Sequence, residues 1–324
     1  MSVKKNIGTH DGAFHCDEAL ACWMLHQTAE FGGASITRTR NPEKLAEMDI
    51  VVDVGAEYDA SKHRYDHHQR EFTTTFDDQH TVTKLSSAGL VYKHFGKEVL
   101  KKIVGCKVSD EAALERLYQL VYDNFIEEID AIDNGVNCYP KDVAPAYKVS
   151  TMLGSRVGRL NPNWNDSESK PDDQFKKAMA ITGDEMEAIV TGYAFSFLPA
   201  RSIVVAAVEA RKSIDESGEI MELSTSCPWK EHLVDIEAET GAKITYVLYP
   251  DQGGSWRIQS VPVSPASFES RKPLPEPWRG VRDQALSDLT GVDGCVFIHA
   301  SGFIGGAKSQ AGARALAKLA IQHA

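Results

Sequence analysis

The chain has 324 residues, of which 42% are hydrophobic and 25% are charged, so its composition is that of a globular protein and excludes disordered and fibrous classes. Because single domains typically span roughly 100 to 200 residues, we expect two domains. The net charge of -11 argues against a protein that coats nucleic acid by charge alone. It leaves room for a phosphate substrate, because bound cations can supply positive charge locally.

The sequence shows no sign of secretion or of a membrane span. Its first residues, MSVKK, have neither the apolar core of a signal peptide nor the Arg-rich composition of a presequence. The longest apolar run, from Ile203 to Val208, is far shorter than the roughly 20 residues that cross a bilayer. Six cysteines occur without a C-x-x-C pair, which predicts neither a disulfide framework nor a structural zinc site. We therefore expect a protein without a membrane partner, located inside the cell in the cytoplasm, nucleus or mitochondrion.

The first third of the chain alternates strand-like and helix-like stretches, which predicts an α/β fold with a largely parallel sheet. Strands are expected at residues 4–9, 34–40 and 49–54. Helices are expected at residues 17–28, at 87–95 behind a cap at Ser86, and at 109–133 before the stop signal Asn134-Gly135.

The remaining elements predict a smaller second α/β domain. Residues 161–173 are polar and contain proline, so they are expected to form an exposed loop, followed by a helix at 174–197. A second set of strands is expected to start at Ile203 and to include residues 243–249 and 256–261, with helices at 280–289 and 310–321. These elements place the domains at residues 1–198 and 199–324.

Four groups of His and carboxylate residues follow predicted strands or helices in the first domain. They are His10, His15 and Asp17; Asp53; Asp66, His67 and His68; and Asp130 with Asp133. We expect these groups to meet, because α/β sheets gather their ligands at the carboxyl ends of strands. Oxygen and imidazole ligands without thiolate favour manganese, magnesium or iron over structural zinc. Their number suits two ions, with Asp53 able to bridge a pair about 3.5 to 4 Å apart.

Simpler interpretations apply to some of the acidic residues. Asp11 is interpreted as a turn residue and Glu18 as a first-turn charge favoured by the helix dipole. Asp130 and Asp133 could also form an exposed helix face, so the sequence leaves open which of the two is a ligand.

The motifs resemble those of the DHH phosphoesterase superfamily, which includes RecJ-type exonucleases, short-RNA nucleases and manganese-dependent inorganic pyrophosphatases. Over its whole length the chain is more similar to one branch, the MYG exonuclease family, in the segments GTHDGAFHCDE, YDHHQREF, EEIDAIDNG, FESRKPLPEPWRG and GCVFIHASGFIGG. The resemblance implies a divalent-metal-dependent 3'-5' RNA exonuclease of the nucleus and mitochondria. Its substrates would be single-stranded RNA 3' ends or short oligonucleotides, and its products nucleoside monophosphates.

The resemblance also implies a role for each site residue. His10 and His15 would hold one ion and Asp17, His67 and Asp133 the other, with Asp53 between them; the ions would be Mn²⁺ or, as an alternative, Mg²⁺. His68 would contact the scissile phosphate, and Asp66 would orient an imidazole from behind. Most of the superfamily has Asp where this chain has His15, so this site is one unit less negative.

The second domain resembles the substrate-binding module of the family. Glycines precede the last predicted helix, where backbone N–H groups and the positive helix end could receive a phosphate. Residues 257–318 contain eight basic and five acidic residues, so this segment carries +3 in a chain of -11. The residues predicted to bind substrate are Arg257, Arg271, Lys272, His299, Gly302, Gly305, Gly306 and Lys308.

Two other functions remain open from the sequence. An inorganic pyrophosphatase or small-nucleotide hydrolase would share the metal ligands, but it would need a dense cationic clamp, whereas SRKPLPEPWRG suits a larger ligand. A non-catalytic RNA-binding or scaffold protein would be expected to lack one or more ligands, and by motif the set is complete.

Overall fold

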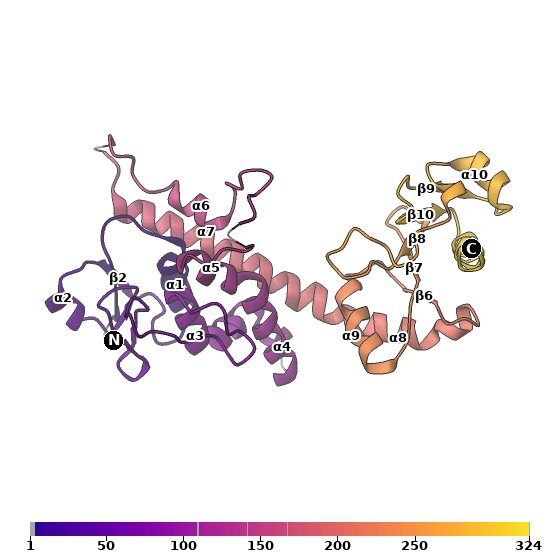
Figure 1. The fold of residues 1–324 in the computed structure, drawn as a ribbon. Helices are drawn as coiled ribbons and strands as arrows, with labels where there is room; N and C mark the ends of the chain where they lie inside the picture. Colours follow the sequence, from indigo (N-terminus) through magenta and orange to yellow (C-terminus); the bar gives the residue numbers. More distant parts are fainter. Residues whose placement is uncertain (1–3, 109, 141, 167, 324) are drawn as a thin grey trace. The chain divides into compact units, whose positions relative to one another are not determined.

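A computed structural model describes residues 4–108, 110–140, 142–166 and 168–323 of the chain (Figure 1). The chain divides into two compact units, Met1–Ala194 and Phe195–Ala324, and each unit contains a five-stranded sheet. The mixed α/β class predicted from the sequence is therefore confirmed. The assignment of residues 1–198 and 199–324 to a phosphoesterase and a substrate-binding domain stays a prediction.

The sheet of the first unit is mostly parallel, with the strand order β2-β1-β3-β5-β4. Its strands are β1 (Asn6–Thr9), β2 (Ser35–Arg38), β3 (Ile50–Val52), β4 (Tyr58–Asp59) and β5 (Arg64–Tyr65). Strand β1 pairs in parallel with β2 and β3, and β3 pairs in parallel with β5, while β4 runs antiparallel to β5. The carboxyl ends of β1, β3 and β5 consequently lie at one edge of the sheet.

The helices of the first unit pack against the sheet and against one another. They are α1 (Cys16–His26), α2 (Pro42–Ala46), α3 (Ser87–Val104), α4 (Glu111–Val121), α5 (Glu127–Asp133), α6 (Leu153–Gly158) and α7 (Pro171–Gly192). Helix α1 packs against α3 and α7, and its side chains Leu20 and Met24 are fully buried. The helix predicted at 109–133 consists of α4 and α5, joined by the π-helical turn η3 (Tyr122–Ile126). Its predicted start, Ser109, lies outside the described residues.

Asp130 anchors α5 to the start of α3. Ser86 precedes α3, as predicted, but the capping acceptor is Asp130: its Oδ1 accepts from the Ser86 backbone N–H at 2.9 Å, the Ser86 hydroxyl at 2.7 Å and the Gly89 N–H at 3.1 Å. The Tyr122 hydroxyl donates to Oδ2 at 3.2 Å. Burial raises the pKa of Asp130 to about 7, although these donors oppose the rise. A carboxylate at a helix N-terminus is the arrangement that the helix dipole favours.

The apolar run 203–208 forms part of α8 (Leu198–Ile214) and not the predicted strand. Val204, Ala207 and Val208 are buried at helical spacing. The π turn η4 (Tyr193–Phe197) precedes Pro199, the residue that lacks a backbone N–H, and the helix continues through this point.

Because the helix is continuous, it is longer than the apolar segments that the sequence analysis considered as membrane spans. The helix Pro171–Ile214 contains an 18-residue window of mean hydropathy 1.5, of which 28% is buried, so it is long and apolar enough to cross a membrane by length and composition. The prediction of no such segment was wrong because it ended a helix at residue 197 and started a strand at Ile203. By length and composition alone, one such helix does not establish a membrane span.

The sheet of the second unit has the order β6-β7-β8-β10-β9. Its strands are β6 (Ile220–Glu222), β7 (Tyr246–Pro250), β8 (Trp256–Ser260), β9 (Cys295–Ile298) and β10 (Ile304–Ala307), accompanied by α9 (Lys230–Thr240), α10 (Asp283–Thr290) and α11 (Gln310–Gln322). Strands β6 and β7 are parallel, and the other pairs are antiparallel.

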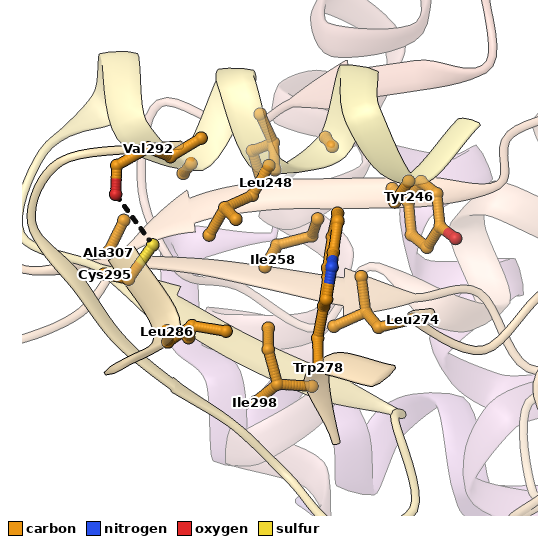
Figure 2. Close-up of a cluster of buried hydrophobic side chains, with 14 of the residues drawn as sticks. Tyr246, Leu248, Ile258, Leu274, Trp278, Leu286, Val292, Cys295, Ile298 and Ala307 are labelled. Carbon is orange, nitrogen blue, oxygen red and sulfur yellow. Dashed lines mark hydrogen bonds between the residues drawn. The ribbon is translucent and has the colours of Figure 1, made fainter. Parts of the chain in front are cut away.

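Both faces of this second sheet are covered. Figure 2 shows one face, where Tyr246, Leu248 and Ile258 of the strands pack with Trp278 beneath a helix. Val247, which lies between Tyr246 and Leu248, belongs to a different buried cluster with residues of α8 and α9. This alternation is the period of a strand whose two faces are both buried.

We predict that Gly89→Ala destabilises the first unit by about 2 to 3 kcal/mol, because a Cβ at this position would overlap the Asp130 carboxylate. Gly192→Ala is the control: its Cβ would meet nothing within 4 Å, so a gain of up to about 1 kcal/mol is expected there. Chemical denaturation followed by circular dichroism measures both. Equal unfolding free energies for the two variants would contradict the role of Asp130.

Candidate active site

The candidate site lies at the carboxyl ends of neighbouring strands in the first sheet. His10 follows β1, Asp53 follows β3, and Asp66 follows β5. Because these strands are parallel neighbours, their ends converge, which is how the topology of α/β proteins usually forms a ligand site.

Helices bring further ligands to the same place. Asp17 and Glu18 lie in the first turn of α1, and Asp133 is the last residue of α5. Asp17 is fixed by the Ser87 hydroxyl, which donates to its Oδ2 at 2.7 Å from the first residue of α3. Asp133 lies one turn beyond Asp130, so the anchor of α5 on α3 also positions Asp133.

All six residues predicted as metal ligands come together in this site. Three groups of side chains, with ligand atoms within 4.8 Å of one another in each group, could hold a metal ion: His10, His15, Glu18 and Asp53; Asp53, Asp66, His67 and His68; and His15, Asp17 and Asp133. Asp53 is shared by two groups, and so is His15. His10 Nε2 lies 3.2 Å from Asp53 Oδ2, and His67 Nε2 lies 2.8 Å from Asp133 Oδ2.

Buried polar atoms without a partner mark the centre of this cluster. Within the described residues, Asp17 Oδ1, Asp53 Oδ1 and His67 Nδ1 are buried and have no hydrogen-bond partner. Each such atom costs about 1 to 3 kcal/mol unless it is satisfied. Three of them from three different elements, all of atom types that bind metals, fit divalent cations as the missing partners.

The charges of the cluster fit the same interpretation. Burial raises the pKa of Asp17 well above its usual value, and the carboxylates of Asp53 and Asp133 raise it further. Burial also raises the pKa of Asp53. For His10, burial lowers the pKa, but hydrogen bonds to Asp53 and Glu18 outweigh burial and raise it to about 10. The carboxylates therefore need positive counter-charge, which a proton on His10 or a divalent cation can supply.

The backbone at Asp53 has an unusual conformation. Its φ of 58° lies in the left-handed region, and Ala56 in the same loop has a φ of 53°. Such conformations cost of order 1 to 3 kcal/mol and are found at active sites more often than elsewhere in a fold, although His63 and Asp283 adopt them outside this cluster. The loop is held by the Ala56 N–H, which donates to Asp66 Oδ2 at 2.6 Å, and by the Asp53 N–H, which donates to the Tyr65 carbonyl at 3.1 Å.

The adjacent residues His67 and His68 lie in different environments. The His67 side chain is 5% exposed within the cluster, whereas the His68 side chain is 61% exposed. His68 Nδ1 lies 2.7 Å from Asp66 Oδ1, and this hydrogen bond raises the pKa of His68. Burial alone would raise the pKa of Asp66, but the bonds from His68 and from the Ala56 N–H lower it below its usual value.

The loop from His10 to His15 is held by side chains that the sequence did not single out. Arg38, 4% exposed at its side chain, donates to the Gly12 carbonyl at 2.6 Å. Asn161 accepts from the Phe14 N–H at 2.9 Å and donates to the Phe14 carbonyl at 2.8 Å. Asn161 begins the segment predicted as an exposed loop, and pairing of this kind has no local sequence signal.

Glu18 corrects the sequence interpretation. It is completely buried, with Oε1 3.0 Å from His10 Nε2, and is therefore part of the cluster rather than a solvated first-turn charge. The available signal was its spacing from His15, whose N–H donates to the Glu18 carboxylate at 2.9 Å as in a capping box. Asp11 is exposed and pairs with Arg40 at 2.8 Å, as suits a turn residue. Asp130 caps α3, so Asp133 is the member of the pair that reaches the cluster.

Two cavities adjoin the cluster. One, of 420 Å³, is lined by polar groups that include Arg40, Asp53 and His68. The other, of 340 Å³, is lined by Asp17 and Asp133 together with apolar side chains. His15 lines both cavities.

The predicted substrate residues of the second unit are largely engaged with protein groups. Arg257 pairs with Asp251 at 2.5 Å, Arg271 forms two bonds to Glu237, and Lys272 Nζ donates to the Ile321 carbonyl at 2.9 Å. Outside the predicted set, Arg314 pairs with Glu222 and Lys318 with Asp215. The local balance of +3 therefore overstates the cationic surface, because acidic residues from outside residues 257–318 neutralise part of it.

Only part of the glycine-rich segment 302–306 forms the predicted turn. Gly302, with φ 73°, lies in a turn beside His299, whose Nδ1 is 2.9 Å from Ser301 Oγ. Gly305 and Gly306 lie in β10, between β8 and β9, and a Cβ at Gly305 would overlap the Ile298 side chain. Lys308 follows β10 and is exposed, and among the described residues we find no hydrogen bond or ion pair of its ammonium group.

Fold and site together define a two-unit α/β protein with a buried cluster of imidazoles and carboxylates that could hold metal ions. The family model MYG1_exonuc, described as an uncharacterised protein family (UPF0160), matches residues 6–321. The chain belongs to this MYG1 exonuclease family, and the resemblance to it seen in the sequence is confirmed.

Relatives from distant eukaryotes match almost the whole chain. It is 49% identical to proteins named MYG1 exonuclease from Mus musculus and Homo sapiens, over 99% of this chain and 86% and 87% of the relatives. It is 44% identical to a MYG1 protein of Saccharomyces cerevisiae, over 98% of this chain and 96% of the relative.

We predict that Asp53→Asn lowers the affinity for Mn²⁺ by more than about 10-fold, because a shared anionic ligand becomes neutral. Asn tolerates the left-handed backbone at this position, so the fold should be retained. Isothermal titration calorimetry measures the affinity. Asp11→Asn is the control, because Asp11 is next to His10 but is exposed and pairs with Arg40. Unchanged Mn²⁺ binding by Asp53→Asn would overturn its assignment as a ligand.

Proposed function

We propose that this chain is a divalent-metal-dependent phosphodiesterase that removes nucleotides from the 3' end of single-stranded RNA and releases nucleoside monophosphates. The exonuclease names of the mouse and human relatives support a nuclease-type hydrolase. The observation that carries metal dependence is the set of unpartnered buried atoms on Asp17, Asp53 and His67. The Asp66-His67-His68 sequence, next to the strand-end Asp53, supports placing the family in the DHH phosphoesterase superfamily.

The proposed ligands divide around Asp53. His10, His15 and Glu18 would hold one ion together with Asp53. Asp17 and Asp133, which group with His15, would hold the other ion together with His67, whose Nε2 lies 2.8 Å from Asp133 Oδ2. Most of the superfamily has an anionic ligand in place of His15, and the buried carboxylate of Glu18 beside His10 would restore that charge. When bound, divalent cations such as Mn²⁺ or Mg²⁺ polarise a phosphoryl oxygen and neutralise the charge that develops on it.

His68 is the proposed catalytic residue outside the ligand set. Asp66 holds its Nδ1 at 2.7 Å, so Nε2 is the nitrogen that remains for substrate. From the exposed edge of the site this nitrogen can donate a hydrogen bond to a phosphoryl oxygen or a proton to the leaving oxygen. Asp66 is the positioning residue, since it fixes the orientation of the imidazole and favours its protonated form.

The charge around the cluster favours a phosphodiester over pyrophosphate. Arg40 is the one Lys or Arg among the residues that line the polar cavity, and it is already paired with Asp11. A small tetra-anion would require several such cations, whereas a phosphodiester carries a single negative charge. A non-catalytic RNA-binding protein is disfavoured because all predicted ligands meet in one cluster.

An intracellular location, in the cytoplasm, nucleus or mitochondrion, is part of the proposal. It is supported by the six cysteines, all of which are free thiols, as expected in a reducing compartment. Fractionation of cells that express a tagged chain would test it, and recovery in the medium would contradict it.

The test of the proposed activity is product analysis with a 5'-labelled oligoribonucleotide. With Mn²⁺ we expect a ladder that shortens by one nucleotide at a time, no reaction in EDTA, and no reaction by Asp53→Asn. Excess pyrophosphate and a dinucleotide serve as competitors. Internal cuts, or preferential hydrolysis of pyrophosphate, would overturn the proposal.

We predict that His67→Ala and His68→Ala fail in different ways. His67 is buried in the cluster and should mainly be needed for metal occupancy, whereas the exposed His68 should mainly be needed for turnover. Loss of His68 should reduce kcat by about 100-fold or more, as for other general acid–base groups. Metal content by mass spectrometry and single-turnover rates separate the two effects. Equal loss of bound metal would contradict this division.

We predict that Lys308→Ala gives a defect that depends on substrate length. The exposed Lys308 would contact a phosphate away from the scissile bond, so its loss should weaken oligoribonucleotide binding by about 1 kcal/mol. Hydrolysis of a chromogenic thymidine monophosphate ester should be unchanged. Lys318→Ala is the control, because this lysine already lies 3.7 Å from Asp215. Affinities are compared at fixed salt, and equal loss on both substrates would argue against a distant contact.

A further inference from the structure

The 340 Å³ cavity is lined by the carboxylates of Asp17, Glu128 and Asp133 and by a set of apolar side chains. The apolar walls are formed by Phe14, Cys16, Ile129, Ile132 and Leu153. Phe14 is completely buried and Ile129 is 6% exposed, whereas Ile132 is 44% exposed, so the cavity has a packed interior wall and a rim that reaches solvent. Its volume lies at the small end of the range of about 300 to 1,000 Å³ typical of ligand pockets.

The two cavities offer different chemistry around one cluster. The polar cavity presents Arg40 and His68, and the apolar cavity presents aliphatic and aromatic side chains, with His15 lining both. A ligand that fills the apolar part of this cavity and also reaches the carboxylate cluster would join an apolar group, such as an aromatic ring, to an anion that divalent cations can bind. A nucleotide has this composition, with its base on one side of the sugar and its phosphate on the other.

We propose that this apolar cavity binds the base of the nucleotide that is released, a proposal that rests on the proposed function. The walls contact ring faces, which every base presents, so binding should depend on the presence of a ring and little on its identity. The volume admits a single nucleoside-sized group, which matches removal of one nucleotide at a time. The protein would therefore recognise the end of an RNA chain by its last base as well as by its phosphate.

Two glycines keep the cavity open. Helix α6 has six residues, and two of them, Gly154 and Gly158, line the cavity. A Cβ at Gly158 would meet nothing within 4 Å, and one at Gly154 would have Ile132 as its nearest neighbour at 4.0 Å. Glycine disfavours a helix, so its presence twice in so short a helix is better explained by the space that it leaves than by local propensity. Gly158 is exposed and a Cβ there has open space around it, so a larger side chain at this position can extend over the cavity without first displacing a neighbour.

The test compares the binding of adenosine monophosphate with that of ribose 5-phosphate, which has the same phosphate and sugar without the base. In the presence of Mn²⁺, we expect the full chain to bind adenosine monophosphate more tightly by on the order of 10-fold or more, as measured by calorimetry. Gly158→Leu should abolish this preference and leave ribose 5-phosphate binding unchanged. Gly192→Leu, at another open helical glycine outside the cavity, should retain the preference.

Each outcome decides the proposal. Equal binding of the two ligands by the unaltered chain, or an unchanged preference in Gly158→Leu, would overturn it. If Gly158→Leu does not fold, Leu153→Ala serves instead, since it removes a wall and should also reduce the preference. A preference that Gly158→Leu abolishes, in a chain that does not shorten RNA, would support the cavity and reject the proposed function. Equal shortening of RNA with normal and abasic 3' ends would support the function and reject the cavity.

Discussion

Buried carboxylates of like charge must be held together against their mutual repulsion, and the first unit is organised around this constraint. Three of them accept hydrogen bonds that fix their positions: Asp17 from the Ser87 hydroxyl, Glu18 from the His15 N–H, and Asp66 from the Ala56 N–H. These donors orient the carboxylates but supply little positive charge. The unpartnered atoms at the centre therefore leave a place that divalent cations suit by charge and by ligand type.

Asp130 and Asp133 show how two identical residues, one helical turn apart, acquire different roles. Asp130 accepts hydrogen bonds at the start of α3 and holds the two helices together, while Asp133 reaches His67 in the cluster. The rigidity needed at the site is thus supplied by a buried carboxylate that is itself outside the ligand groups. Gly89 allows the close approach, so a position without a side chain contributes to the geometry of the site.

The two units use charge in opposite ways. In the first, acidic groups converge and positive charge is scarce, which suits divalent metal ions. In the second, two of the four lysines and arginines predicted to bind substrate, Arg257 and Arg271, form ion pairs with Asp251 and Glu237, and these pairs support the fold. Lys308 differs from them in being exposed at the end of β10. Counting charges along a segment cannot separate these cases, because the partners come from distant parts of the chain.

The sequence by itself determined the α/β class, the mostly parallel sheet of the first unit and the convergence of His10 and Asp53, because periodicity and strand-end position are local properties. Its motifs determined the family. Tertiary structure decided what local patterns leave open. Spacing puts Glu18 and Asp133 on helix faces, but only packing shows that those faces turn toward the cluster. The run at 203–208 is apolar enough for a strand or a helix, and burial of Val204, Ala207 and Val208 selected the helix. Partners separated by more than a hundred residues, such as Phe14 and Asn161, meet only when the fold brings their backbones together.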